Sequence, residues 1–103
     1  MSDFLNRVFE RVSEINEGIS KYEFSKQYLG KSESYYAYLT STDSEESAAV
    51  LRNLYRNTIQ RARLLEDIAR KYKVKNEDKR IAYLKIAEDT LDEFKKEKEC
   101  FKA

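Results

Sequence analysis

The chain has 103 residues, enough for one compact domain and too few for two of ordinary size. Hydrophobic residues make up 41% and charged residues 38%, which is typical of a folded, soluble protein and not of a disordered one. The lack of proline and the presence of only two glycines exclude an all-β sandwich with its frequent turns. The lack of histidine removes most general-base catalysis and most zinc sites.

The net charge is +1, so no long-range field draws the chain toward DNA or a membrane, and any polyanion must bind a local patch. Cys100 is the only cysteine, which rules out an intramolecular disulfide and indicates a reducing compartment. The N-terminus lacks the features of a signal peptide, and no apolar stretch approaches a membrane span. We therefore expect a cytoplasmic protein.

The first predicted helix extends from Asp3 to about Glu17, and Gly18 supplies its C-terminal stop. A second helix is predicted after Ser20, because Ser20 and Glu23 have the spacing of a capping box, and Gly30 ends it. Apolar residues at helical spacing supply the buried sides: Leu5, Val8, Phe9, Val12 and Ile15 in the first helix, and Phe24, Tyr28 and Leu29 in the second.

A third helix is predicted from Ser32, a good N-cap residue, to about Thr40. It is crowded by Tyr35, Tyr36, Tyr38 and Leu39, which cannot all face one core. A loop over residues 41–44 follows, in which Asp43 and Glu46 have the spacing of another capping signal.

A long helix is predicted from about Ser44 to Tyr72. Its apolar positions alternate steps of three and four, as in a heptad seam: Ala48, Leu51, Tyr55, Thr58, Ala62, Leu65, Ala69 and Tyr72. At 1.5 Å per residue this helix is roughly 40 Å long.

A turn is predicted at 73–76 with Asn76 as N-cap, followed by a last helix from Glu77 to about Phe101. The last helix keeps the same spacing, interrupted by Lys98, through Ile81, Leu84, Ala87, Leu91, Phe94 and Phe101. The two long helices then fold back as an antiparallel hairpin.

The predicted hairpin is longer than a globule of this size, and its apolar seams are broader than one partner needs, since Val50, Leu54, Leu64, Ile68 and Ile86 lie beside them. We therefore expect a homodimer through residues 44–101. The predicted fold is all-α: a three-helix unit over residues 1–42 and a long antiparallel helical hairpin over residues 43–103, forming one continuous domain.

The stretch Lys21–Leu39 has the layout of a helix-turn-helix: a short capped helix, Leu29-Gly30, a turn, a serine cap and a second short helix. It resembles the repressor-type helix-turn-helix of small bacterial and phage regulators. It is also similar to short uncharacterised bacterial proteins with the pattern Phe-Ser-x-x-x-Leu-Gly-x-Ser-x-Ser-Tyr-Tyr, here Phe24 to Tyr36.

The resemblance implies a role for each matching position. Leu29, Gly30, Ser32, Tyr36 and Leu39 fit the core leucine, the turn glycine, the cap and two inward positions. Lys26 and Lys31 depart from the pattern, which has a small residue at the first position and an apolar residue at the second. The residues that the motif directs toward bases in the DNA groove are Ser32, Glu33, Ser34, Ala37 and Tyr38.

Basic residues are concentrated in residues 52–80, with ten basic against four acidic side chains. Such a cluster can bind phosphates through counterion release. The same charge pattern is also typical of a polar helix face that is exposed to solvent. The residues expected to contact phosphates are Lys26, Lys31, Arg52 and Arg56, and the hairpin tip Arg70–Arg80 is a second candidate.

Three other features of the sequence bear on function. Glu88, Asp89, Asp92 and Glu93 could hold Mg²⁺ or Ca²⁺, but lysines three or four residues away favour surface ion pairs, so no metal or other cofactor is expected.

The tyrosines at 22, 28, 35, 36 and 38 could stack on single-stranded nucleic acid. We expect Tyr28 and Tyr36 to lie in the core and Tyr35 and Tyr38 to be exposed. Cys100 has no activating neighbour, so it is expected to be an apolar filler or an exposed thiol, and an enzyme is not expected.

The leading hypothesis is a small DNA-binding regulator that reads duplex DNA with the helix after Gly30. The alternatives are a dimeric, non-enzymatic helical module that binds another protein, in which the helix-turn-helix is only a corner of the core, and a binder of single-stranded nucleic acid.

Overall fold

The computed structural model describes the backbone of residues 3–42 and 46–102 and the side chains of residues 4–42 and 46–96. That part of the chain is all-α and contains no strand. Its helices are α1 (Asp3–Ile15), α2 (Lys21–Gln27), α3 (Tyr35–Thr42), α4 (Ala48–Tyr72) and α5 (Glu77–Lys102). The fold class is therefore the predicted one.

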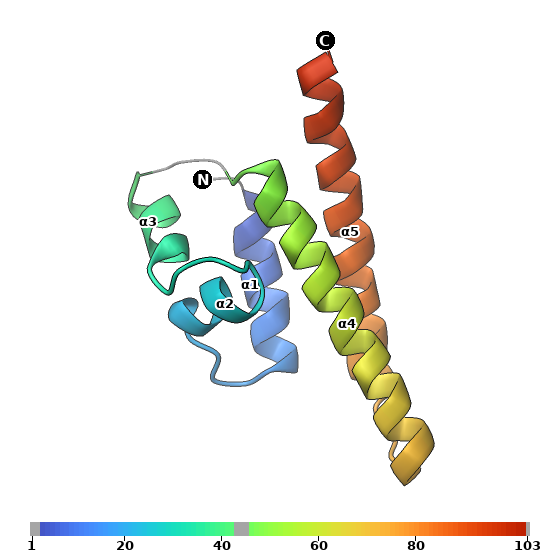
Figure 1. Ribbon diagram of the computed structural model, residues 1–103. Helices are drawn as coiled ribbons and strands as arrows, with labels where there is room; N and C mark the ends of the chain where they lie inside the picture. The colour runs from blue at the N-terminus through green and yellow to red at the C-terminus, as the bar shows by residue number, and fades with distance from the viewer. Residues whose placement is uncertain (1–2, 43–45, 103) are drawn as a thin grey trace.

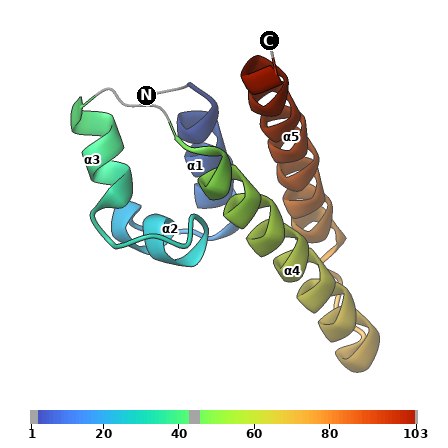
Figure 2. The same ribbon diagram turned by 45° about the horizontal axis from the view of Figure 1, so that its top comes forward.

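The two long helices α4 and α5 form an antiparallel pair, and α1, α2 and α3 lie together on one side of it (Figures 1 and 2). The described molecule measures 46 × 30 × 18 Å along its principal axes. Its long dimension is that of the hairpin, whose far end extends beyond the three short helices (Figure 1). One buried cluster unites side chains from all five helices.

The beginnings of α3 and α4 differ from the prediction. Helix α3 begins at Tyr35 and not at Ser32, because the Ser32 carbonyl accepts the Tyr35 amide in a turn (3.1 Å) before the helix starts. Helix α4 is capped by Ser47, whose hydroxyl accepts the Val50 amide (3.3 Å), so the helix begins at Ala48 and not at Ser44. The proposed cap Asp43 lies outside the described residues.

The hairpin turns without glycine, because Lys73 itself adopts the left-handed conformation (φ 56°). Asn76 precedes α5 as predicted, and its carbonyl accepts the Arg80 amide (3.1 Å). Its side-chain amide does not cap α5, however, but donates to the Leu65 carbonyl of α4 (2.9 Å). The turn is thus tied back to the preceding helix.

The predicted seam of α4 is confirmed at its centre, where Leu51, Thr58 and Ala62 are buried, but Tyr72 at its end is 64% exposed. Thr58 satisfies its hydroxyl within the helix by donating to the Leu54 carbonyl (2.9 Å), which lets a polar residue stay in the core.

The predicted seam of α5 is wrong at Ile81 and Leu84, which are exposed, and is confirmed at Ala87, which is buried. The other buried residues there are Tyr83, Ile86 and Thr90. The physical reason is that α5 packs against α1 as well as α4, which shifts its buried side. The Tyr83 hydroxyl also has a buried partner, the Tyr28 hydroxyl at 2.9 Å.

Part of the apolar surplus that suggested a dimer is used within the chain. Val50, Leu54 and Ile86 are fully buried and belong to the common core. Leu64, by contrast, is 59% exposed. A homodimer must therefore form through apolar surface that the fold leaves exposed.

Candidate nucleic-acid interface

Helix α2 is fixed at its start by the predicted capping box. The Glu23 amide donates to the Ser20 hydroxyl (3.1 Å), and the Ser20 amide donates to the Glu23 carboxylate (3.4 Å). Phe24, Tyr28 and Leu29 are fully buried, as the pattern predicted. The first helix of the motif therefore has a defined position in the core.

Ser25 joins α2 to α3. It is fully buried; its carbonyl accepts the Lys31 amide (3.0 Å) and its hydroxyl accepts the Tyr36 amide (2.9 Å). The small buried residue of this corner is thus Ser25. Lys26 stands where the helix-turn-helix pattern has a small residue, and its side chain is exposed. This place suits a small side chain with a hydrogen-bond acceptor.

The turn after α2 is held by a row of polar side chains on α4. Asn53 donates its amide to the Leu29 carbonyl (3.1 Å), and Asn57 donates to the Tyr28 carbonyl (2.9 Å). The guanidinium of Arg61 lies over the ring of Tyr28, 4.2 Å from its centre. Residues four apart share one helix face, so α4 caps the carbonyls that end α2.

Gly30 is required in this turn for two reasons. Its φ of +65° is disfavoured for residues with a side chain, and a Cβ atom there would lie 3.0 Å from the Asn53 amide nitrogen.

The polar row of α4 had no recognisable signal in the sequence beyond its spacing of four, because each of its residues also suits an exposed helix face.

Of the residues expected to face bases, most lie on the open surface. Ser32, Glu33 and Ser34 are exposed but precede α3, and Tyr38 within α3 is 59% exposed. Ala37 is half-buried. On the opposite side of α3, Tyr36 and Leu39 are buried at 2% exposure, as expected. Helix α3 thus has a clear inner and outer side.

The lysines near this surface have partners. Lys26 lies 3.9 Å from the Glu33 carboxylate, with both side chains largely exposed. The ammonium group of Lys31 lies 5.8 Å from the centre of the Tyr35 ring. An exposed pair of this kind is worth little, so phosphate can displace Glu33 from Lys26 at small cost.

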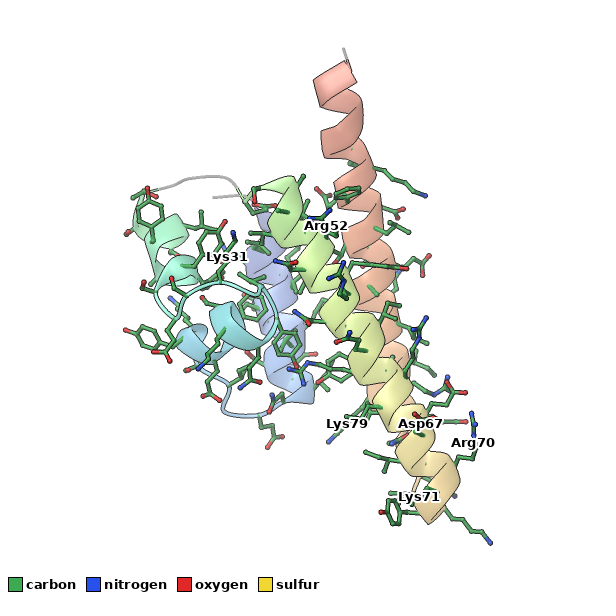
Figure 3. The ribbon with its side chains drawn as sticks, viewed as in Figure 1. Lys31, Arg52, Asp67, Arg70, Lys71 and Lys79 are labelled. Atoms are coloured by element: carbon green, nitrogen blue, oxygen red, sulfur yellow. The ribbon has the colours of Figure 1, made fainter. Side chains whose placement is uncertain are left out.

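The structure separates Arg52 and Arg56 from these lysines. Arg52 directly precedes Asn53, which faces the Gly30 turn, and consecutive residues of a helix point about 100° apart. In the view of Figure 3, Lys31 and Arg52 lie on opposite sides of α4. The four residues expected to contact phosphates therefore do not form one surface.

The basic segment 52–80 is likewise divided among different faces. Arg61 is engaged with Tyr28, and Arg70 pairs with Glu66 (3.1 Å). Arg70, Lys71 and Lys79 lie at the end of the hairpin far from α3 (Figure 3). A shallow groove at this tip is lined by Leu65, Ala69, Val74 and charged residues of both signs.

The tyrosines do not form an exposed stack. Tyr28 and Tyr36 are buried, as expected, and burial raises the pKa of both phenols. Tyr35 is half-buried, contrary to expectation, and burial also raises its pKa. Of the five tyrosines in this region only Tyr22 and Tyr38 are exposed, at 57% and 59%.

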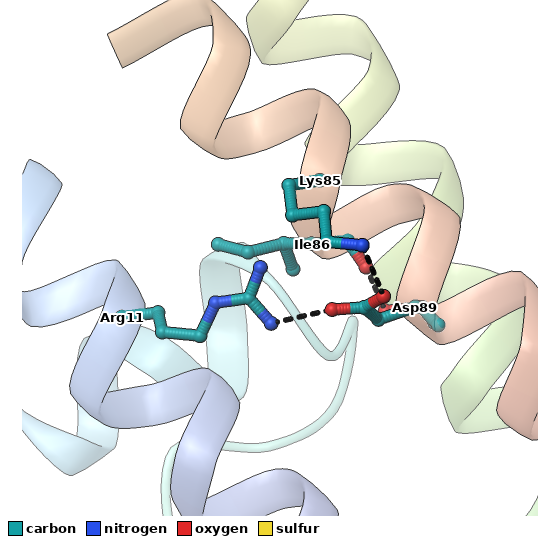
Figure 4. Close-up of polar contacts among 5 residues, drawn as sticks. Arg11, Lys85, Ile86 and Asp89 are labelled. Atoms are coloured by element: carbon teal, nitrogen blue, oxygen red, sulfur yellow. Dashed lines mark hydrogen bonds and ion pairs between the residues drawn. The ribbon is translucent and has the colours of Figure 1, made fainter. Parts of the chain in front are cut away.

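Two members of the acidic cluster of α5, Asp89 and Glu93, form ion pairs. Asp89 contacts Arg11 of α1 at 2.9 Å and Lys85 at 3.3 Å (Figure 4), and Glu93 contacts Lys96 at 3.4 Å. Burial raises the pKa of the Asp89 carboxyl, but the hydrogen bonds from Arg11 and Lys85 outweigh it and hold this pKa below its ordinary value. Among the described side chains no group of three or more has metal-binding geometry. The side chain of Cys100 lies outside the described ones.

Residues 5–98 match the model of a protein family described as a family of unknown function, DUF6626. The chain belongs to this family. No curated protein and no solved structure matches the chain significantly. None of the described helices combines the length and the apolarity that crossing a membrane requires.

Proposed function

We propose that this DUF6626 protein binds duplex DNA through the outer side of α3, with Ser34 and Tyr38 toward the bases and Lys26 and Lys31 toward phosphates. The observation that carries the proposal is the two-sidedness of α3: Tyr36 and Leu39 are buried, while Tyr38 on the other side is 59% exposed. A recognition helix needs this arrangement, since one side anchors it and the other enters the groove.

The rigidity of the corner supports the same proposal. Base contacts discriminate only when the reading helix is held in a fixed position. Here Ser25 bonds to both the turn and α3, and Asn53 and Asn57 hold the turn against α4. The proposed surface does not include Arg52 and Arg56, because they lie on another side of α4 than Asn53, which faces the turn after α2.

The chemistry of the surface sets the expected salt dependence. Each phosphate contact lowers the logarithm of the binding constant by about 0.9 per tenfold rise in salt. With Lys26 and Lys31 as phosphate contacts, we expect a slope of about −2. Binding that is this weakly electrostatic depends on contacts to bases for its specificity.

The test begins with retention of fragmented genomic DNA on the immobilised full chain at about 50 and 200 mM salt. We expect salt-sensitive enrichment of particular fragments. The enriched site is then titrated by fluorescence anisotropy with Tyr38→Ala, Ser34→Ala, and the matched control Tyr72→Ala, whose side chain is 64% exposed at the hairpin tip. Weakening by Tyr38→Ala and Ser34→Ala but not by Tyr72→Ala supports the proposal, whereas no retention at the lower salt contradicts it.

A second candidate function is a helical module that binds another protein. It is favoured by the large apolar side chains that the hairpin leaves exposed: Leu64, Tyr72, Val74, Ile81 and Leu84. Apolar contacts of this kind persist at high salt, which separates this function from DNA binding. The homodimer expected from the length of the hairpin belongs to both proposals.

A further inference from the structure

The side of the hairpin turned away from α1, α2 and α3 carries an ordered pattern of side chains. Helices α4 and α5 flank the turn 73–76, so residues at equal distances from it stand at the same level. Ala62 and Ala87 form such a level, and both are buried, at 2% and 1% exposure. They mark the line along which the two helices pack together.

Starting from Ala62 and Ala87, the direction of every other side chain follows from the rotation of a helix by about 100° per residue. On α4, Val50, Leu54 and Arg61 point toward the short helices, and the opposite edge carries four exposed arginines: Arg52, Arg56, Arg63 and Arg70. On α5, Ile86 and Asp89 point toward α1, and the opposite edge carries four exposed residues: Glu77, Ile81, Leu84 and Glu88. We call the surface formed by these two edges the outer face.

The two edges of the outer face differ in charge. The α4 edge is net basic, with Glu66 and Asp67 beside its four arginines; only Arg70 has an ion-pair partner among the described residues, namely Glu66. The α5 edge has Glu77 and Glu88, with Asp92 beside them and Lys95 as its one basic residue. The α5 edge is also apolar in part, with Ile81 56% and Leu84 39% exposed.

We propose that the outer face is the interface of a homodimer in which two hairpins stack around a two-fold axis parallel to the helices. Such an axis places α4 of one protomer over α5 of its partner, so that the basic edge of each meets the acidic edge of the other. A second copy is the occupant that this face fits, because the complementary charge lies on the face itself.

The levels of the hairpin give the register of the charged pairs. Arg63 then lies opposite Glu88 of the partner subunit, and Arg70 opposite Glu77 of the partner subunit. Arg56 lies opposite Asp92 of the partner subunit. Exposed pairs contribute little affinity, so they set register and orientation, while Leu84 and Ile81 supply the attraction by losing contact with water.

Nucleic acid is a poorer occupant of the outer face. A row of arginines alone suits a phosphate backbone, but Glu77 and Glu88 beside it repel phosphates, and Leu84 between them gains nothing from contact with phosphate. The inference concerns the homodimer of the proposed function and does not depend on DNA binding. Its test therefore uses the full chain without DNA.

The decisive experiment is a charge exchange followed by sedimentation equilibrium over a range of chain concentrations. The wild-type chain is expected to show twice the chain mass of 12.2 kDa. Arg63→Glu and Glu88→Arg each place like charges opposite one another and should raise the dimer dissociation constant about 10-fold. The double variant Arg63→Glu/Glu88→Arg restores opposite charges and should return the constant to within about threefold of wild type.

Two further variants complete the design. Leu84→Asp should raise the dissociation constant by about 100-fold or more, because it buries a charge in the apolar centre. Lys21→Glu on α2, an exposed basic residue on the side of the short helices, is the matched control and should leave the constant unchanged. Circular dichroism of each variant checks that the helices form.

Each outcome decides the matter. Restoration by the double variant supports the proposal. A chain that is monomeric at every concentration overturns it, as does a dimer that withstands Arg63→Glu and Leu84→Asp, or one that the double variant fails to restore. If Arg63→Glu instead abolishes DNA retention of a monomeric chain, the outer face is a polyanion surface and the inference is wrong.

Discussion

Asn57 of α4 donates a hydrogen bond to the Tyr28 carbonyl at 2.9 Å, while Arg61, one turn further along, lies over the ring of the same tyrosine at 4.2 Å. One residue at the end of α2 is thus held by two side chains of α4, at its backbone and at its ring. Because the carbonyl is near the end of a helix and has no partner within it, the contact with Asn57 replaces water there.

The first prediction follows from this contact. Asn57→Leu removes the donor and leaves the Tyr28 carbonyl covered by an apolar side chain, which should lower the free energy of unfolding by about 1–3 kcal/mol. Urea denaturation followed by circular dichroism measures the change. Gln60→Leu, at an exposed position on the same helix, is the control and should stay within about 0.5 kcal/mol of wild type. Equal effects of the two substitutions would contradict the role of Asn57.

The second prediction compares the two glycines, which both have positive φ. Gly18→Ala and Gly30→Ala should each cost about 1–2 kcal/mol of stability for the left-handed backbone alone. Gly30→Ala should cost more, because its new Cβ meets the Asn53 side chain at 3.0 Å, while nothing lies within 4 Å of a Cβ at Gly18. A double-mutant cycle of Gly30→Ala with Asn53→Ala isolates this contact; a coupling energy of zero would show that the clash does not matter.

The third prediction concerns alkaline pH. Burial and the hydrogen bond with Tyr83 raise the pKa of Tyr28, so the folded protein holds this proton more tightly than the unfolded chain. The contribution to stability is complete below the ordinary tyrosine pKa of about 10 and is lost as the pH rises above it. Stability should therefore fall above pH 10, and Tyr28→Phe should make that fall less steep. Urea midpoints measured between about pH 8 and 11.5 check this, and an unchanged slope in Tyr28→Phe would contradict it.

The fourth prediction concerns acid pH and the contact between α1 and α5. The pKa of Asp89 is lowered from its ordinary 3.8, so its contribution is present above that pH and is lost as the pH falls through the lowered value. Arg11→Gln should cost up to about 1 kcal/mol at neutral pH, since the pair is partly exposed. The difference from wild type should shrink below pH 4. Lys21→Gln, at an exposed position on α2, serves as the control, and a pH-independent cost of Arg11→Gln would argue against the ion pair.

Much of the fold followed from local patterns. Five helices in the right order, the capping box at Ser20 and the burial of Phe24, Tyr28 and Leu29 were all predictable, because each depends on residues within one or two helical turns. The turn at 73–76 was also predictable, although Lys73 takes the conformation usually left to glycine.

The candidate site was predictable only in outline. The inner and outer sides of α3 follow from the pattern around Tyr36 and Tyr38, but the start of α3 at Tyr35 does not, because the Ser32 carbonyl satisfies the Tyr35 amide in a turn. The place of Arg52 away from Lys31 depends on how α4 is rotated about its axis. That rotation is fixed by Asn53 and Asn57 at the end of α2.

By itself the sequence determined the class of the fold, the helices and the outward position of Tyr38, since helix periodicity and capping are local properties of the chain. Only the tertiary structure decided which side of each long helix is buried. Helix α5 packs against both α4 and α1, so Tyr83 and Thr90 enter the core and Ile81 and Leu84 remain outside, which no single periodic pattern can specify. The physical reason is that a helix with two neighbours is oriented by contacts between residues far apart in the chain, here Tyr28 with Tyr83 and Arg11 with Asp89.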